Sequence, residues 1–247
     1  MMRGALSADP TPEATLVRAV LFDLDGTLLD LDLEAFLQRY FAALERAAAP
    51  LSAHAALDTG VMSGLHAATR RMMTAHPGRT NRDVFYEEFT QLTGIDLGEH
   101  WSVFEEFYRD VFPTLADSAR PAPGGRLAVT TALDLGLRVA IATNPIFPLS
   151  AIEHRIAWAG LRDVPVHVVT SYETMTATKP HPEYFRQTAR LLDVEPRDCL
   201  MVGDDAVLDM AAADVGMRTF YVGDRPGTAA DTTGDLEALA QLLPRLV

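Results

Sequence analysis

Apolar segments of strand length alternate with amphipathic segments of helical length through the second half of the chain. Strands are expected near 137–143, 166–170, 199–202 and 219–222, and helices between them at 149–159, 182–192 and 206–215. Strands that alternate with helices through short connections form a parallel sheet with helices on both faces. The sequence therefore predicts an α/β fold with a doubly wound parallel sheet.

A further strand of this sheet is expected much earlier, at residues 16–22. The sequence there, LVRAVLF, is short, mostly apolar and β-rich, as in a strand that is buried on both faces. Asp23 follows directly at its carboxyl end. The segment between this strand and the remaining strands is then an insertion into the sheet domain.

The inserted segment has a helical pattern throughout. Between 34 and 112, aromatic and apolar residues recur at helical spacing. Thr80 with Asp83 resembles a capping box at a helix start, and Gly94 and Pro113 mark two helix ends. We therefore expect three parts: a loose N-terminal tail at 1–15, a doubly wound core formed by 16–30 and 121–247, and an all-helical domain at 31–120.

The composition limits the classes of partner. A net charge of −13 and an isoelectric point near 4.9 are unfavourable for binding nucleic acid or an anionic membrane, because both need clustered Lys and Arg. The single cysteine, Cys199, excludes an intramolecular disulfide and a multi-cysteine zinc site. No apolar run is long enough for a signal peptide near the N-terminus or for a membrane span elsewhere. We expect a cytoplasmic protein without nucleic-acid or membrane partners.

Polar or charged side chains follow the predicted strands. In chain order, these residues are Asp23, Asp25, Thr143, Asn144, Lys179, Asp204 and Asp205. Taken singly, an aspartate after a strand is most often a helix cap or a turn former. In an open α/β sheet, however, ligands bind beyond the carboxyl ends of the strands, so the whole set predicts one site. Neighbouring buried carboxylates there require a compensating cation.

Lys179 is the only lysine in a chain with 21 lysine and arginine residues in total. Chance is one explanation for its position, because a single lysine must occupy some position in the chain. The alternative is that a compact ammonium serves here where a planar guanidinium cannot.

Four segments, FDLDGTLLD, ATNP, KPHPEYF and VGDDAVLD, occur in this order and resemble the four motifs of the haloacid dehalogenase superfamily of phosphohydrolases. The longer run ATNPIFPLSAIEHRIAWAGL also resembles a subgroup of phosphatase-like members. The resemblance covers nearly the whole chain if the helical insertion is the cap domain of this family. It implies a Rossmann-like core with an inserted helical cap.

The resemblance implies chemical roles for individual residues. Asp23 would attack phosphorus and form an aspartyl-phosphate, and Asp25 would serve as general acid and base. Lys179 would neutralise the nucleophile and a phosphate oxygen. Thr143 and the backbone at Asn144 would hold the remaining oxygens.

The resemblance also implies a Mg²⁺ ion, because phosphoryl transfer needs charge neutralised on the transferred oxygens and magnesium prefers oxygen ligands. The expected ligands are Asp23, the carbonyl of Asp25, and Asp204, with Asp205 as a second candidate. Asp209 is expected to act through water or by pairing with Lys179. Thr27 is expected to hold Asp25 through its hydroxyl.

Hydrolysis of a small phosphorylated metabolite is the leading interpretation of these motifs. Within this superfamily, the resemblance implies that a dehalogenase would not need the acid at Asp25 and that a phosphonate-cleaving enzyme would need a lysine in the insertion, which has none. A sugar-phosphate mutase and a catalytically silent binding or regulatory protein remain as alternatives. Arg82, in the loop HPGRTNR, is either a contact with the leaving group or a solvated residue at a helix start. We expect a monomer or a homodimer.

Overall fold

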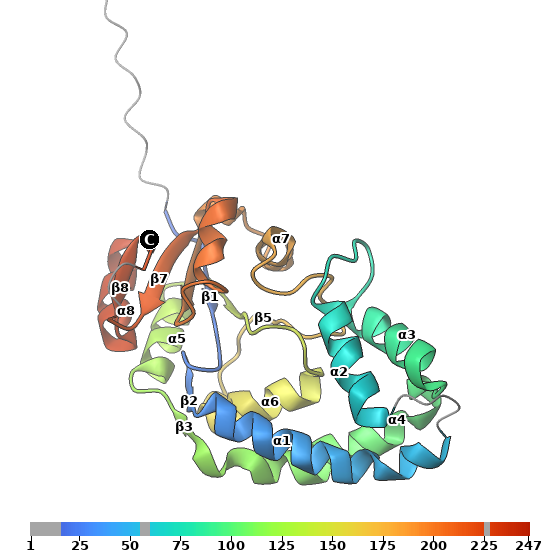
Figure 1. Ribbon diagram of the computed structural model, residues 1–247. Helices are drawn as coiled ribbons and strands as arrows, with labels where there is room; N and C mark the ends of the chain where they lie inside the picture. Colours follow the sequence, from blue (N-terminus) through green and yellow to red (C-terminus); the bar gives the residue numbers. More distant parts are fainter. Residues whose placement is uncertain (1–15, 55–59, 225–227) are drawn as a thin grey trace, which may run out of the picture.

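A six-stranded sheet and a group of helices inserted after its first strand form the two parts of the molecule (Figure 1). The computed structural model describes residues 16–54, 60–224 and 228–247. The predicted N-terminal tail, 1–15, lies outside the described residues. Within the described part of the chain, no helix combines the length and the apolar character needed to cross a membrane.

The six strands of the main sheet are paired in parallel. Their order across the sheet is β5 (Val168–Val169), β4 (Arg138–Ile141), β1 (Ala19–Phe22), β6 (Cys199–Gly203), β7 (Arg218–Val222) and β8 (Thr232–Gly234). The chain builds one half of the sheet through β4 and β5 and then returns past β1 to build the other half. The predicted α/β fold with a doubly wound parallel sheet is confirmed.

Both faces of the sheet are covered, because successive residues of a strand point to opposite sides. In β1, Val20 and Phe22 pack on one face, and Ala19 and Leu21 pack on the other. The helices on the first face are α5 (Gly125–Asp134), α6 (Leu149–Trp158) and α8 (Leu236–Leu242). The second face is covered by α7 (Pro182–Leu191) and a short 3₁₀ helix, Met210–Val215. Burial on both sides explains why the sequence of β1 is continuously apolar.

The inserted helices have a hydrophobic cluster of their own, in which Phe36, Phe107 and Phe112 are fully buried. In chain order, this segment contains α1 (Leu33–Ala48), a 3₁₀ helix (Ala49–His54), α2 (Val61–Met72), α3 (Asn81–Thr93), α4 (Leu97–Glu106), a π-helical turn (Phe107–Val111) and a 3₁₀ helix (Phe112–Ser118). Two short antiparallel strands, β2 (Leu29–Leu31) and β3 (Ala119–Pro121), lead into and out of it. The ring of Trp158 in α6 stacks on Phe112, with 5.4 Å between centroids, and joins the two parts.

The ends of α3 follow the signals in the sequence. The hydroxyl of Thr80 accepts a hydrogen bond from the N–H of Asp83 at 3.1 Å. Gly94 follows the helix in the left-handed conformation, with a φ of 73°, which glycine adopts without strain. Pro113, predicted to end the last helix, instead lies in the first turn of a 3₁₀ helix, where its missing N–H has no cost.

Several predicted elements differ from the structure. The helix expected at 206–215 is a turn followed by the 3₁₀ helix, because Asp205 Oδ1 accepts the N–H groups of Val207 and Leu208 at 2.8 and 2.9 Å and holds the chain in that turn. The strand expected at 166–170 is reduced to the two residues of β5. The β2–β3 pair adds strand residues at both ends of the segment expected to be wholly helical. These strands are too short to show a period in the sequence.

Helices α2 and α3 approach closely at a glycine. A Cβ atom added to Gly64 of α2 would lie 2.5 Å from Cγ2 of Thr93 in α3. The Thr93 side chain is held in place, since its hydroxyl donates to the carbonyl of Phe89 at 2.8 Å and accepts from the N–H of Ile95 at 3.1 Å. Packing therefore requires a glycine near the start of α2.

We expect Gly64→Ala to lower the free energy of unfolding by about 1–3 kcal/mol, the usual cost of overpacking. This loss would occur although alanine is ordinarily favoured inside a helix by about 1 kcal/mol. Urea unfolding followed by circular dichroism measures the change. Adding Thr93→Ser, which keeps the hydroxyl and removes the methyl group, should recover most of the stability. A Gly64→Ala variant as stable as the wild type would contradict this account of the contact.

Candidate active site

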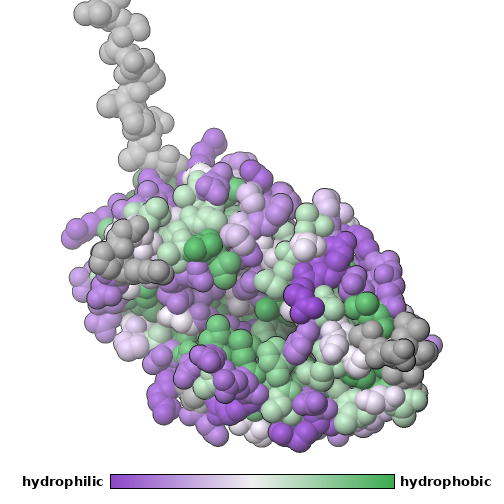
Figure 2. Space-filling model, in the orientation of Figure 1, coloured by the Kyte–Doolittle hydropathy of each residue, from purple (hydrophilic) through white to green (hydrophobic). Residues whose placement is uncertain are grey.

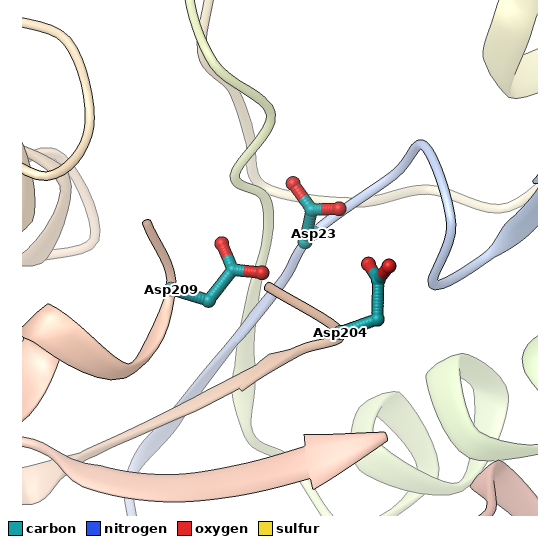
Figure 3. A group of neighbouring side chains, drawn as sticks. All are labelled: Asp23, Asp204 and Asp209. Carbon is teal, nitrogen blue, oxygen red and sulfur yellow. The ribbon is translucent and has the colours of Figure 1, made fainter. Parts of the chain in front are cut away.

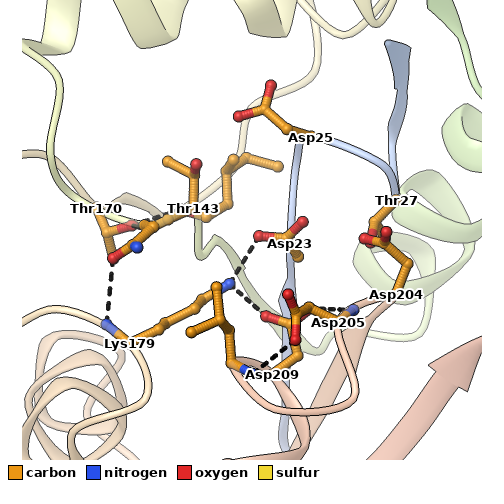
Figure 4. A network of polar contacts seen from close by, with 12 residues as sticks. Asp23, Asp25, Thr27, Thr143, Thr170, Lys179, Asp204, Asp205 and Asp209 are labelled. Carbon is orange, nitrogen blue, oxygen red and sulfur yellow. Dashed lines mark hydrogen bonds and ion pairs between the residues drawn. The ribbon is translucent and has the colours of Figure 1, made fainter. Parts of the chain in front are cut away.

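The carboxyl ends of β1, β4 and β6 meet at a cavity of about 230 Å³. Its charged and polar lining residues are Asp23, Asp25, Thr143, Asn144, Arg155, Lys179, Asp204, Asp205 and Asp209. Every strand-end residue that the sequence pattern singled out therefore lies at this one edge of the sheet. Figure 4 shows most of these side chains converging from separate segments of the chain.

The ammonium of Lys179 lies between two carboxylates. Its Nζ donates to Oδ1 of Asp23 at 2.7 Å and to Oδ1 of Asp209 at 2.6 Å (Figure 4). The Lys179 side chain is only 1% exposed, so these contacts replace its hydration. Burial alone lowers the pKa of Lys179, but the carboxylates of Asp209 and Asp23 outweigh it and raise the pKa above its usual range. The lysine is therefore a buried cation held between two acidic side chains.

Three carboxylates form a compact acidic cluster beside this lysine. One oxygen each of Asp23, Asp204 and Asp209 can be chosen so that all three lie within 4.8 Å of one another (Figure 3). Burial raises the pKa of Asp23 to about 8, although the charge of Lys179 opposes the shift. Burial also raises the pKa of Asp204. Clustered carboxylate oxygens suit a hard divalent cation such as Mg²⁺.

The sequence predicts that the Thr27 hydroxyl holds Asp25, and this prediction is wrong. Thr27 instead contacts a member of the acidic cluster. Its hydroxyl donates to Oδ1 of Asp204 at 2.8 Å. The chain reverses sharply at Gly26, whose φ is 89°, and this turn carries Thr27 toward β6. A Cβ atom at Gly26 would lie 2.3 Å from Oδ2 of Asp204, so only glycine leaves room for that carboxylate.

The two remaining acidic residues after β6 have different partners. The Oδ1 atom of Asp205 accepts the two N–H groups of the turn that follows, and the residue lies outside the compact cluster. Asp209 pairs with Lys179 through Oδ1, and its Oδ2 accepts the N–H of Asp205 at 3.0 Å. The pairing that the sequence predicted for Asp209 is thus present in the structure.

Thr143 and Asn144 lie where β4 ends. The backbone carbonyl of Thr143 accepts hydrogen bonds from the hydroxyls of Thr170 at 2.7 Å and Tyr184 at 3.0 Å. The Oδ1 atom of Asn144 accepts the N–H of Lys179 at 3.2 Å. These bonds tie the end of β4 to the segment that carries the lysine.

Arg155 is a second buried cation, which the sequence reasoning did not identify. It projects from α6, its side chain is 2% exposed, and its Nη1 donates to Oδ2 of Asp25. The guanidinium carbon lies 4.5 Å from the centre of the Phe147 ring. Among the described residues, neither Nε nor Nη2 of Arg155 has a hydrogen-bond partner, and neither does Oδ1 of Asp25.

One signal in the sequence could have found this arginine. In α6, the buried residues are Ala151, Ile152, Arg155 and Ile156, so an arginine occupies the apolar stripe of an amphipathic helix. An arginine in such a position needs a buried anion as partner. The run ATNPIFPLSAIEHRIAWAGL contains this helix, but its helical period alone does not say which anion the arginine meets.

Arg82 does not line the cavity in this structure. Its side chain is 45% exposed at the start of α3, where its Nε lies 3.8 Å from Asp83. The neighbouring Asn81 is fully buried and donates from Nδ2 to the carbonyl of Pro145 at 2.9 Å. The loop HPGRTNR thus contacts the core through its asparagine.

Comparison with known proteins gives a family match over most of the chain. A family model described as haloacid dehalogenase-like hydrolase matches residues 17–215. The chain is 30% identical to a phosphoglycolate phosphatase of Cupriavidus necator, over 91% of this chain and 92% of that protein. It is 25% identical to the putative phosphatase YhcW of Bacillus subtilis, over 92% of this chain and 94% of that protein.

Solved structures share the fold. CbbY from Rhodobacter sphaeroides in complex with phosphate aligns with a TM-score of 0.56 and 21% identity, over 94% of this chain and 99% of that one. The β-phosphoglucomutase of Clostridium difficile aligns with a TM-score of 0.55 and 18% identity, over 91% of this chain and 93% of that one. At these identities the similarity shows the fold alone.

The buried pair of Asp25 and Arg155 predicts non-additive effects on stability. Asp25→Asn leaves the guanidinium buried without a counter-charge, so we expect it to lower the free energy of unfolding by about 3 kcal/mol. Combining it with Arg155→Met removes the buried charge as well and should recover at least half of the loss. Chemical denaturation of both single variants and the double variant measures the coupling.

Asp163→Asn is the matched control for this cycle. It removes the carboxylate from an exposed pair with Arg126, and we expect a much smaller change in stability. Strictly additive losses for Asp25→Asn and Arg155→Met would contradict a direct pairing of the two charges.

Proposed function

The chain belongs to the haloacid dehalogenase-like hydrolases, and we propose that it is a phosphatase that hydrolyses a small phosphate ester with magnesium and through an aspartyl-phosphate on Asp23. The observation that carries the proposal is the contact of a buried lysine with Asp23, which is itself one of the three clustered carboxylates. A carboxylate held in this way is fixed in position for attack. Its second oxygen, Oδ2, is the atom we assign to the attack on phosphorus.

Lys179 has two tasks in this proposal. It holds Oδ1 of Asp23, and its charge compensates the negative charge that phosphate brings into a buried site. The hydroxyl of Thr143 and the backbone N–H of Asn144 are proposed to bind the other phosphate oxygens. Both residues line the cavity beside Asp23.

Magnesium would be held by Asp23 and Asp204, together with the backbone carbonyl of Asp25. When bound, it supplies positive charge to the phosphate oxygens during transfer. Both oxygens of Asp209 already accept hydrogen bonds, so we propose that Asp209 acts through water. Asp205 remains a second candidate ligand, although its Oδ1 is used by the turn after β6.

Asp25 is proposed to protonate the leaving oxygen and then to activate the water that hydrolyses the intermediate. Its Oδ2 is occupied by Arg155, whereas its Oδ1 has no partner among the described residues. The free oxygen is therefore the one we assign to proton transfer. Arg155 would serve as a positioning residue that fixes the direction of this carboxyl group.

The helical segment, residues 31–120, is proposed to be the cap domain that covers the site. Leu33 and Leu37 of α1 line the same cavity as the carboxylates, which supports this assignment. Closing a site in this way excludes water and strengthens its electrostatic interactions.

A sugar-phosphate mutase on the same fold differs only in the group that accepts the phosphoryl. The solved β-phosphoglucomutases in the comparison carry no argument beyond the fold, whereas the curated relatives at 25% and 30% identity have phosphatase names. Conversion of β-glucose 1-phosphate to glucose 6-phosphate without release of phosphate would favour the mutase.

We expect Asp23→Asn to lower phosphate release by at least about a thousandfold, because the amide cannot act as the nucleophile. Release of phosphate from p-nitrophenyl phosphate and a panel of phosphorylated metabolites, with magnesium or with a chelator, measures the effect. Asp163→Asn, on the exposed surface, serves as the matched control and should leave activity unchanged. Retention of activity by Asp23→Asn at unchanged thermal stability would overturn the assignment of the nucleophile.

Magnesium binding should strengthen as the pH rises toward 8 and then level off. Because burial raises the pKa of Asp23 to about 8, the metal-free carboxyl is mostly protonated below that pH, and the ion must displace a proton. The Kd should therefore fall up to about tenfold per pH unit below this pKa. Calorimetry in buffers of different ionisation enthalpy detects the released proton.

The control for this measurement is Asp23→Asn, whose binding should be weaker and less dependent on pH. The raised pKa of Asp204 acts in the same direction, so a smaller pH dependence can remain in this variant. A wild-type Kd that is constant between pH 6 and 8 would contradict the account.

A further inference from the structure

A second cavity, of about 180 Å³, adjoins the phosphate site. It lies between helices α1 to α4 on one side and the loops that follow β4 and β5 on the other. Leu37, Ile146 and Phe147 line both cavities, so the two adjoin at these side chains. Figure 2 shows hydrophobic residues gathered around the hollow in the middle of the face in view.

The walls of this second cavity, which we call the aromatic cavity, are built largely from rings. They include Phe41 of α1, Phe85 of α3, Trp101 and Phe104 of α4, and Phe147 after β4. The centroid of Phe147 lies 5.3 Å from that of Tyr40 in α1, in an edge-to-face arrangement. Among the described residues, no Asp, Glu, Lys or Arg lines this cavity, and its single histidine, His66, is on the exposed rim.

The hydroxyl groups in the walls are largely used within the protein. Those of Tyr40 and Tyr108 bond to each other at 2.9 Å, and that of Thr69 donates to the carbonyl of Leu65 at 2.8 Å. At most one hydroxyl, that of Tyr172, lacks a partner within the described part of the chain. The aromatic cavity therefore offers a ligand apolar contact and few polar partners.

The size of the aromatic cavity fits one ring or slightly more. An apolar cavity of about 150 Å³ in another protein stays free of water and binds benzene. A carboxylate placed in such a cavity would meet no cation and would lose its hydration. The buried guanidinium of Arg155 lies on the other side of Phe147, where it already contacts Asp25.

We propose that the aromatic cavity receives the leaving group of the substrate, and that this enzyme prefers phosphate monoesters of apolar, ring-bearing alcohols to those of short hydroxy acids. The proposal rests on the proposed phosphatase function. The phosphate would lie at Asp23, and the ester oxygen would point past Asp25 toward Phe147. The ring of the leaving group would then fill the aromatic cavity between α1, α2 and α4.

Benzyl phosphate and phosphoglycolate test the preference for an apolar ring over a short hydroxy acid. Both are esters of primary alcohols, so their chemical reactivity is similar. We expect kcat/KM for benzyl phosphate to exceed that for phosphoglycolate at least tenfold, with ethyl phosphate as the small reference ester. Benzylphosphonate, which is not hydrolysed, should bind to the enzyme in calorimetry and should compete with benzyl phosphate. A preference for phosphoglycolate over benzyl phosphate would overturn the proposal.

Two variants alter the aromatic cavity without touching the phosphate site. Thr69→Trp fills it from α2 and should lower kcat/KM for benzyl phosphate at least tenfold, while ethyl phosphate changes less than twofold. Ser63→Trp adds the same bulk on the exposed side of α2 and is the matched control. Trp101→Leu enlarges the cavity and should shift the preference from benzyl phosphate toward 2-naphthylmethyl phosphate.

The outcomes separate this proposal from the phosphatase assignment. If all three esters are hydrolysed equally well and Thr69→Trp changes none of them, the cavity does not bind the leaving group, and the phosphatase function stands. If no ester is hydrolysed but benzylphosphonate binds and Thr69→Trp prevents this binding, the ligand class is supported and the catalytic function is wrong. Should Thr69→Trp fail to fold, Trp101→Leu provides the test. An unchanged preference between benzyl phosphate and 2-naphthylmethyl phosphate in that variant would then overturn the proposal.

Discussion

The buried ammonium of Lys179 is the interaction on which the site depends. It joins the end of β1 to the turn after β6 through two short hydrogen bonds, and the segment that carries it is tied to the end of β4 through Asn144. Without this charge, the carboxylates of Asp23 and Asp209 would repel each other in a buried space. When the three acidic residues of the cluster are all ionised, one cation does not balance them, and a divalent ion can neutralise the remaining negative charge.

Much of this arrangement is encoded locally and could be predicted. The strand β1 is buried on both faces and is therefore continuously apolar, and the acidic residues follow strands directly, so their common position at one sheet edge follows from topology. Three details depend on contacts between distant segments: the partner of Thr27, the anion that meets Arg155, and the exposure of Arg82. A helical period shows that a residue faces inward, but it does not identify the group across from it.

The two cavities differ in polarity, and each would bind a different part of the substrate. Charged groups from the sheet edge surround the phosphate site, whereas side chains from the inserted helices supply most of the aromatic cavity. Phe147 lies at the border, since it lines both cavities and stacks under the guanidinium of Arg155. A single ring thus separates the charged part of the site from its apolar part.

The composition of the chain makes the site unusually easy to observe. Because Lys179 is the only lysine, incorporation of ¹⁵N-labelled lysine introduces a single side-chain ammonium signal, and this nucleus lies between Asp23 and Asp209. Burial protects its protons from exchange with water, which is what makes such a resonance visible. The residue that balances the charge of the site is therefore also a built-in spectroscopic reporter of what enters it.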